Sequence, residues 1–370
     1  MKPRREILET PPVHHGGRLA GTGDLVATST KHQDFSVCLN AYGPAPIVRS
    51  AIRESPIDEY PDRLSRAPRQ AVAYRCDRPM NEIVFGAGAS ELIQAVCFAY
   101  LSRGDCVVIM QPAFGEYERA SLLCGAQIHH PTNALNHAAP TLDDSVTELV
   151  STIFRVRPRL VFMATPTSPS GAQYAVPMLR HIANMCAQCD SLLILDQSYD
   201  AFSANPLGTP ALPGNDHVVH IRSLTKDHAL AGIRVAFAVA PPDVANDIER
   251  GRVPWAASSA AQDAAVAAMS DEAMRHVAET TRCLRADAVR IAVFCASIGL
   301  WVEPSSTHYL LIRCVNAAAA HDSLLRQHGV LVRDCCSFGL PQHIRVAARR
   351  PDDNTTLLDA LRSLSSHQTS

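Results

Sequence analysis

Short apolar runs alternate with longer segments of helical spacing through the first two thirds of the chain. The runs are rich in Val, Ile and Leu, which predicts buried strands. They cover residues 81–85, 106–110, 160–164 and 191–195, and a further run leads through Ile221. Between two of these runs, apolar residues recur at helical spacing at Leu92, Val96, Ala99 and Tyr100. This alternation predicts an α/β fold with a mostly parallel sheet and helices on both of its faces.

The pattern changes after about residue 240. Residues 241–290 are rich in alanine and predict helices. Further on, strand and helix patterns are mixed: residues 309–313 and 344–347 predict strands, and residues 354–364 predict a closing helix. The second part of the chain therefore predicts a smaller α+β unit.

These patterns divide the chain into three parts. We expect an N-terminal arm of residues 1–45, a large domain of residues 46–245 and a small C-terminal domain of residues 246–370. In the arm, residues 35–39 predict a short strand. A loop rich in Gly and Pro follows it, where Asn40 can present its amide to a ligand.

Composition removes several classes of function. The chain has 370 residues, is 47% hydrophobic and carries a formal net charge of −2, so we expect a globular protein that binds no nucleic acid. The twelve cysteines are scattered through apolar segments, and the pair at Cys186 and Cys189 has no second pair, so we expect no metal site. We see no signal peptide and no apolar segment of membrane-spanning length, which predicts a cytoplasmic protein.

Four chemically capable residues each follow a predicted strand: Phe114, Ser168, Asp196 and Lys226. In a parallel sheet the ligand lies beyond the carboxyl ends of the strands. Lys226 alone could be a surface lysine that caps a strand. Its convergence with the other three favours a partly buried amine instead, and burial lowers the pKa of a lysine so that it can attack a carbonyl carbon.

Three other features have two interpretations each. The turn at residues 86–90 precedes a helix, and it is either a plain tight turn or a cradle for a phosphate at the helix N-terminus. Asp196 follows an apolar run and needs a partner, which is either backbone or a cationic ligand atom. Phe114 either belongs to the core or covers a planar ligand. The histidine and glycine pairs at residues 14–17 could also belong to a flexible tail.

Together these pieces make up the parts of a pyridoxal-phosphate site: a lysine, an acid, a phosphate cradle, an aromatic ring and an arginine. The sequence resembles the fold-type I pyridoxal-phosphate enzymes of the aminotransferase class I/II group over nearly its whole length. The most specific element is Ser-Leu-Thr-Lys at residues 223–226, followed by Ala-Gly-Ile-Arg at residues 231–234. The resemblance implies an aspartate-aminotransferase-like fold.

The resemblance also implies roles for individual residues. Lys226 matches the lysine that forms a Schiff base with the cofactor, Asp196 the acid that faces its pyridine nitrogen, and Tyr199 the phenol at its 3-oxygen. Phe114 matches the ring that stacks on the cofactor. Further cofactor contacts fall on Gly88, Ala89, Ser90, Ser168, Ser223, Thr225 and Arg234.

Substrate contacts and a partner subunit follow from the same resemblance. Arg345 matches the arginine that binds the substrate α-carboxylate as a bidentate pair. The other substrate contacts fall on His15, Gly16, Asn40 and Arg333. Tyr60 matches a residue that reaches the cofactor phosphate of the neighbouring subunit, which implies a homodimer.

The sequence resembles two subfamilies of this group. His15-Gly16-Gly17, residues 114–120, residues 253–255 and residues 332–335 resemble threonine-phosphate decarboxylase, so our first hypothesis is a lyase that releases CO2 from an O-phosphorylated amino acid. The alternative is an aminotransferase of the histidinol-phosphate aminotransferase type, or a divergent member with its own substrate in secondary metabolism. A third hypothesis is a binding or regulatory protein without catalysis on the same fold.

Three positions depart from the resembled pattern. Ser168 replaces the asparagine of Asn-Pro-Thr-Gly, Gln197 replaces the glutamate of Asp-Glu-Ala, and Cys38 replaces an asparagine of the N-terminal loop. Tyr199 is typical of the aminotransferases. These departures spare Lys226 and Asp196, so they concern the substrate and the reaction more than the cofactor.

Overall fold

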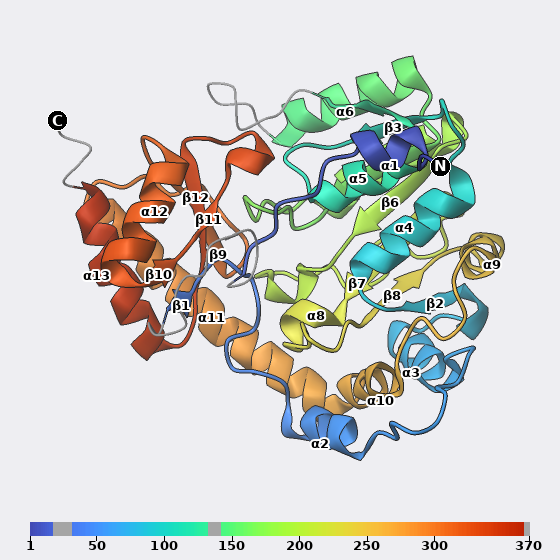
Figure 1. Cartoon of the computed structure of the whole chain (residues 1–370), viewed down its shortest axis with the longest axis horizontal. Helices are drawn as coiled ribbons and strands as arrows, with labels where there is room; N and C mark the ends of the chain where they lie inside the picture. Colours follow the sequence, from blue (N-terminus) through green and yellow to red (C-terminus); the bar gives the residue numbers. More distant parts are fainter. Residues whose placement is uncertain (18–31, 132–141, 366–370) are drawn as a thin grey trace.

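A seven-stranded sheet forms the centre of the larger part of the molecule (Figure 1). This computed structural model describes residues 1–17, 32–131 and 142–365. The strand order is β2 (Ile83–Gly86), β8 (Ala236–Val239), β7 (Val218–Ser223), β6 (Leu192–Asp196), β5 (Leu160–Ala164), β3 (Cys106–Ile109) and β4 (Gln127–His129). β8 pairs antiparallel with both of its neighbours, β2 and β7, and every other pair in this sheet is parallel. The predicted α/β fold with a mostly parallel sheet is confirmed.

Helices cover both faces of this sheet, and successive side chains of a strand point to opposite faces. Val107 and Ile109 pack in the core cluster that contains α4 (Ala89–Tyr100), α5 (Gly115–Leu123) and α9 (Pro242–Arg250). Val108 packs on the opposite face, against α6 (Leu142–Val156) and α7 (Val176–Gln188). Near β2 and β8, a further cluster involves α2 (Pro46–Glu54), α3 (Arg66–Cys76) and α10 (Ser259–Ala268).

A second, three-stranded antiparallel sheet has the order β11 (Arg333–Asp334), β12 (His343–Ala347) and β9 (Tyr309–Arg313). It shares its own apolar core with three helices: α11 (Asp271–Ser297), α12 (Ala317–His328) and α13 (Pro351–Ser365). Figure 1 shows this unit beside the large sheet, with α11 running from the small unit toward α10. The helix α10 follows the predicted domain boundary in sequence but packs on α2 and α3, which precede it. The division at residues 245 and 246 stays a prediction.

The N-terminal arm joins both parts of the molecule. Its short helix α1 (Arg5–Glu9) packs on α5, and its strand β1 (Gln33–Asp34) pairs in parallel with β10 (Val330–Leu331). The predicted strand at residues 35–39 is wrong, because the paired residues are 33 and 34. Phe35 is instead fully buried in the C-terminal core. The predicted arm between residues 18 and 31 lies outside the described residues.

None of the helices within the described ranges combines the length and the apolar character that crossing a bilayer requires.

Gly171 connects the two sheets and generates a prediction. Its carbonyl oxygen accepts hydrogen bonds from the Ser306 backbone N–H and hydroxyl at 3.0 and 2.8 Å. Its φ is +75°, and an added Cβ would collide with the Ser305 and Thr307 side chains. Gly208 has nearly the same φ, +76°, but nothing lies within 4 Å of an added Cβ. Gly208 is therefore a matched control for backbone strain.

We expect Gly208→Ala to lower the free energy of unfolding by about 1–2 kcal/mol, the strain of a left-handed alanine. Gly171→Ala should lower it by about 3 kcal/mol or more, because the collision adds to the same strain. Urea unfolding of both variants checks this. Equal losses of unfolding free energy would mean that the collision with Ser305 and Thr307 costs nothing.

Candidate active site

Lys226 lies in the one-turn helix α8 (Leu224–Asp227), directly after the central strand β7. The Ser223 hydroxyl caps this helix by accepting a hydrogen bond from the Thr225 N–H at 3.2 Å. Burial lowers the pKa of the Lys226 amine, and the positive charges of Arg345 and Arg234 lower it further, against the opposing effects of Cys38 and Asp196. The surroundings therefore favour the neutral, nucleophilic form of this amine.

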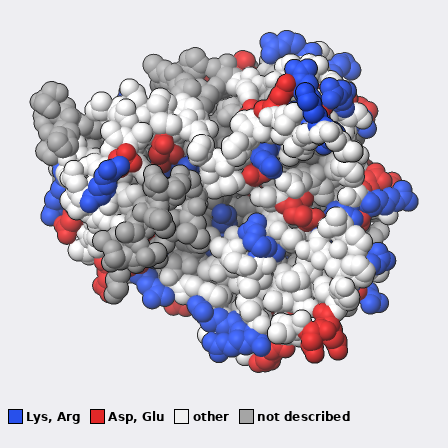
Figure 2. Space-filling view, viewed as in Figure 1, with Lys and Arg blue, Asp and Glu red and all other residues white. Residues whose placement is uncertain are grey.

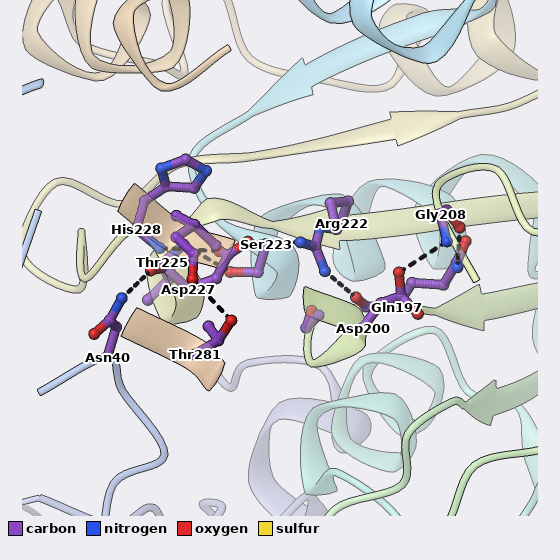
Figure 3. Close-up of polar contacts among 12 residues, drawn as sticks. Asn40, Gln197, Asp200, Gly208, Arg222, Ser223, Thr225, Asp227, His228 and Thr281 are labelled. Carbon is purple, nitrogen blue, oxygen red and sulfur yellow. Dashed lines mark hydrogen bonds and ion pairs between the residues drawn. The ribbon is translucent and has the colours of Figure 1, made fainter. Parts of the chain in front are cut away.

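Two buried residues, Arg222 and Asn40, hold α8 in place (Figure 3). The Arg222 guanidinium pairs with the Asp227 carboxylate at 2.6 Å and donates to the Gln197 carbonyl at 2.7 Å. Asn40 donates its backbone N–H to the Lys226 carbonyl at 2.9 Å, and its amide donates to the Asp227 carbonyl at 2.9 Å. The prediction that Asn40 presents its amide to a substrate is therefore wrong, because that amide supports the loop that carries Lys226.

Gln197, one of the departures from the resembled pattern, also points away from the site. Its amide nitrogen donates to the Gly208 carbonyl at 2.7 Å, and its amide oxygen lies 3.0 Å from His220 Nδ1. Gln197 and His220 are buried, so a neutral amide at this position makes these bonds without placing a charge in the interior.

Asp196 is the last residue of β6 and is 7% exposed. One carboxylate oxygen accepts a hydrogen bond from the Tyr117 hydroxyl at 2.7 Å, and the other accepts one from the Ser198 N–H at 2.8 Å. Sequence reasoning missed Tyr117. The available signal was its position three residues after Phe114 in a helical segment, which places the two on neighbouring parts of one helix face.

The turn before α4 lies directly against Arg234. Gly88 has a φ of +94°, and a Cβ there would lie 2.5 Å from the Arg234 guanidinium. The first residues of α4, Ala89 and Ser90, line the same cavity as Thr225 and Arg234. Unpaired N–H groups at a helix N-terminus and an adjacent arginine together favour a bound phosphate.

Two cavities meet at Lys226. The inner cavity has a volume of about 300 Å³ and contains Asp196, Ser223 and the first residues of α4 in its lining. The outer cavity has a volume of about 310 Å³ and extends to the N-terminal arm and the small sheet. The two cavities share five of their lining residues: His15, Phe114, Ser168, Tyr199 and Lys226. Figure 2 shows basic side chains beside a hollow near the middle of this face.

Three arginines line the outer cavity, Arg119, Arg333 and Arg345, and the last two come from the small sheet. Arg345 is 6% exposed and donates to the Ser168 hydroxyl at 2.8 Å and to the Ser36 carbonyl at 2.7 Å, while its Nε has no partner. Arg333 donates to the His14 carbonyl at 2.8 Å and to the Ser337 hydroxyl at 2.7 Å. Both guanidiniums thus face a cavity next to Lys226, where they can bind anionic groups.

The arm closes one side of the outer cavity, so residues 14–17 are not a free tail. His15 Nε2 lies 3.0 Å from the Glu116 carboxylate, and its ring centre lies 5.7 Å from that of Phe114. The Gly17 N–H donates to the Ser36 hydroxyl at 2.9 Å. Gly16 packs closely on the Ser36 carbonyl, where an added Cβ would lie at 2.9 Å.

Tyr199 and Tyr60 have contrasting positions. The Tyr199 ring centre lies 5.8 Å from Lys226 Nζ, and burial raises the pKa of its phenol, so the hydroxyl keeps its proton. Tyr60 is 82% exposed, stacks on Trp255 at 5.0 Å between ring centres, and lies outside the lining of both cavities. The chain therefore does not use Tyr60 in its own cavities.

The inner cavity fits pyridoxal phosphate. A buried amine can hold the aldehyde, Asp196 offers a carboxylate for the ring nitrogen, and the Gly88 turn with Arg234 offers an anion site for the phosphate. Ser168 lines both cavities, but its hydroxyl accepts from Arg345, so its bond in this structure is to that arginine.

Comparisons with known proteins agree with this geometry. The sequence profile of the family described as "Aminotransferase class I and II" matches residues 34–361. Histidinol-phosphate aminotransferase of Symbiobacterium thermophilum is 29% identical over 367 residues, which cover 98% of this chain and 96% of that protein. Its namesake from Roseobacter denitrificans is 32% identical over 332 residues, covering 87% and 88%.

Solved structures show the same fold. Histidinol-phosphate aminotransferase from Sinorhizobium meliloti in complex with pyridoxal-5'-phosphate aligns with a TM-score of 0.77 at 22% identity, covering 90% of each chain. A Thermus thermophilus aspartate aminotransferase mutant aligns with a TM-score of 0.80 at 16% identity, covering 98% and 99%. With the family match over most of its length, the chain belongs to the aminotransferase class I and II family and is a pyridoxal-phosphate-dependent enzyme of fold type I.

Proposed function

We propose that this enzyme transfers the amino group of a substrate that carries a second, anionic group, with histidinol phosphate as the first candidate. The observation that supports this most is the outer cavity, which adjoins Lys226 and contains Arg333, Arg345, Arg119 and His15 in its lining. A phosphate ester matches the donors of such a cavity. The relatives named histidinol-phosphate aminotransferase support this alternative over the decarboxylase that the sequence motifs put first.

In this proposal each residue has a separate task. Pyridoxal phosphate, when bound, supplies an aldehyde that captures the amino group and a ring that withdraws electrons from the adjacent carbon. Lys226 holds the cofactor and then moves the proton at that carbon, which its low pKa suits. Asp196 would hold the ring nitrogen of the bound cofactor, and Tyr199 would donate its hydroxyl to the 3-oxygen. Phe114 would cover the ring, and the Gly88 turn with Arg234 would hold the phosphate.

The two arginines would bind the two ends of the substrate. Arg345 is held by Ser168 and Ser36 but keeps a buried, unpartnered Nε, so an arriving carboxylate or phosphate would satisfy it. Arg333 is held against the arm by the His14 carbonyl. We propose that the arm, with His15 and Gly16, forms the end of the site that recognises the distal anion.

We also propose that the enzyme is a homodimer. Tyr60 and Trp255 form an exposed aromatic pair outside the chain's own cavities. A partner subunit would cover this pair, and Tyr60 would then contact the partner's cofactor phosphate.

A direct assay tests the proposed reaction. The purified enzyme with pyridoxal phosphate is given histidinol phosphate and 2-oxoglutarate, and glutamate formation is measured. We expect glutamate to form, and we expect histidinol without its phosphate to react at least tenfold more slowly, because the cavity arginines then lack a partner. Release of CO2 from O-phosphothreonine without any amino transfer would contradict the proposal.

The lowered pKa of Lys226 predicts a pH-dependent stability of the protein without cofactor. Between that lowered pKa and the ordinary lysine value near 10.4, the unfolded chain binds more protons at this site, so the stability of the wild type rises with pH. Lys226→Met removes this dependence. We expect its melting temperature to exceed that of the wild type at pH 7, with the gap closing toward pH 10.

The control for this prediction is Lys2→Met, which changes an exposed lysine and should leave the stability curve unchanged. The same Lys226→Met protein should lose turnover by at least about 10²–10⁴-fold, the contribution of proton transfer alone. A variant less stable than the wild type at every pH would show that the charged form of Lys226 is not penalised by burial.

Glu116 tests the arm. Glu116 lies on the first turn of α5. Its carboxylate is 3.0 Å from His15 and 3.7 Å from Arg119. Glu116→Gln should raise the KM for a phosphorylated substrate roughly tenfold with little change in kcat, because the loss of one charged hydrogen bond loosens His15. Steady-state kinetics with histidinol phosphate measure this.

Glu82→Gln is the control, since Glu82 also pairs with an arginine, Arg78 at 2.7 Å, but lies outside the lining of both cavities. Its KM should stay within about twofold of the wild-type value. If both variants behave alike, His15 has no special part in substrate binding.

A further inference from the structure

The carboxylate of Asp196 is held from two sides by this chain. Tyr117 donates its hydroxyl to one oxygen at 2.7 Å, and Ser198 donates its backbone N–H to the other at 2.8 Å. Each oxygen therefore has one donor from the protein and keeps further acceptor capacity. The two donors come from different elements, α5 and the turn after β6, so together they prevent the carboxylate from rotating.

Tyr117 is itself fixed by its packing. It is 1% exposed, its ring stacks on Phe162 with 5.0 Å between centres and an interplanar angle of 12°, and its edge meets Phe114 at 5.8 Å. Burial, together with the charge of Asp196, raises the pKa of its phenol far above the ordinary value, so the hydroxyl remains a donor. The ring, the hydroxyl and the carboxylate thus have one arrangement.

Tyr117 also borders the cofactor cavity. It lines the inner cavity together with Phe114 and Asp196. The first turn of α5 therefore contributes both the ring that would cover the cofactor and the hydroxyl that orients the acid beneath it. A tyrosine that served only as core would not need its hydroxyl at this position, because phenylalanine fills the same apolar space.

We propose that Tyr117 is a positioning residue: its hydroxyl aligns the Asp196 carboxylate for the ring nitrogen of pyridoxal phosphate. The inference rests on the proposed role of Asp196. Removing the hydroxyl leaves a buried carboxylate with a single protein donor, free to turn away from the ring nitrogen. The cofactor then loses the best geometry of its charged hydrogen bond.

Tyr117→Phe tests this, because it removes one oxygen and keeps the stack on Phe162. Apoenzyme is titrated with pyridoxal phosphate, and the dissociation constant is read from the visible absorbance of the bound cofactor. We expect the constant to rise roughly tenfold or more, the effect of a hydrogen bond to a charged group. Tyr174→Phe is the control: Tyr174 is also buried, at 3% exposure, but lies in the core cluster on the other face of the sheet.

A double-mutant cycle separates positioning from general destabilisation. In an Asp196→Asn background, adding Tyr117→Phe should change the dissociation constant by less than about twofold, since the oriented charge is already gone. The melting temperature of each apoenzyme shows whether the variant is folded. If the hydroxyl were only structural, Tyr117→Phe would lower the melting temperature equally in the wild type and in Asp196→Asn.

Each outcome is decisive. A wild-type dissociation constant for Tyr117→Phe, with weakened binding by Asp196→Asn, overturns the inference and leaves the role of Asp196 intact. Equal losses from Tyr117→Phe in both backgrounds also overturn it. Normal binding by Asp196→Asn would remove the proposed role of Asp196, and the inference with it. Should Tyr117→Phe not fold, the same titration with 3-fluorotyrosine at position 117, a stronger donor of the same shape, must change the constant for the inference to stand.

Discussion

The partial burial of a single amine is the constraint on which the site depends. Lys226 lies where protein replaces part of the surrounding water, and the positive charges of Arg345 and Arg234 also act on it. An ammonium ion is costly in such a place, so the neutral amine is favoured. The surrounding structure keeps this arrangement in place: the Arg222–Asp227 pair and the Asn40 contacts hold the short helix α8. Stability is given up at this point in exchange for a reactive group.

The parallel sheet explains why the other functional groups lie close to this amine. The carboxyl ends of β3, β5, β6 and β7 lie at one edge, and each is followed by a residue of the site. Residues that follow these strands make up most of the inner cavity, which His15 of the arm also lines, whereas the outer cavity adds Arg333 and Arg345 from the small sheet. The inner cavity therefore depends mainly on the large sheet, and the outer cavity depends on the small sheet as well.

Sequence patterns predicted the elements whose periodicity is strong. The runs that became β3, β5 and β6 lie within two residues of their prediction, and Phe114, Asp196 and Lys226 are brought together as expected. Contacts between distant segments could not be predicted in this way. Tyr117, Glu116 and the role of Asn40 depend on which elements meet in space, and β1 is displaced because it pairs with β10 rather than continuing the apolar run. Short motifs also favoured the decarboxylase, whereas the relatives support the aminotransferase.

Covalent trapping of the cofactor tests the central claim most directly. The chain contains three lysines: Lys2, Lys31 and Lys226. The enzyme is loaded with pyridoxal phosphate, reduced with borohydride, digested and analysed by mass spectrometry. The account predicts that the mass of the reduced cofactor is found on the peptide with Lys226 and is absent from the peptides with Lys2 and Lys31. Labelling at either of those two, or a protein that takes up no cofactor, would contradict it.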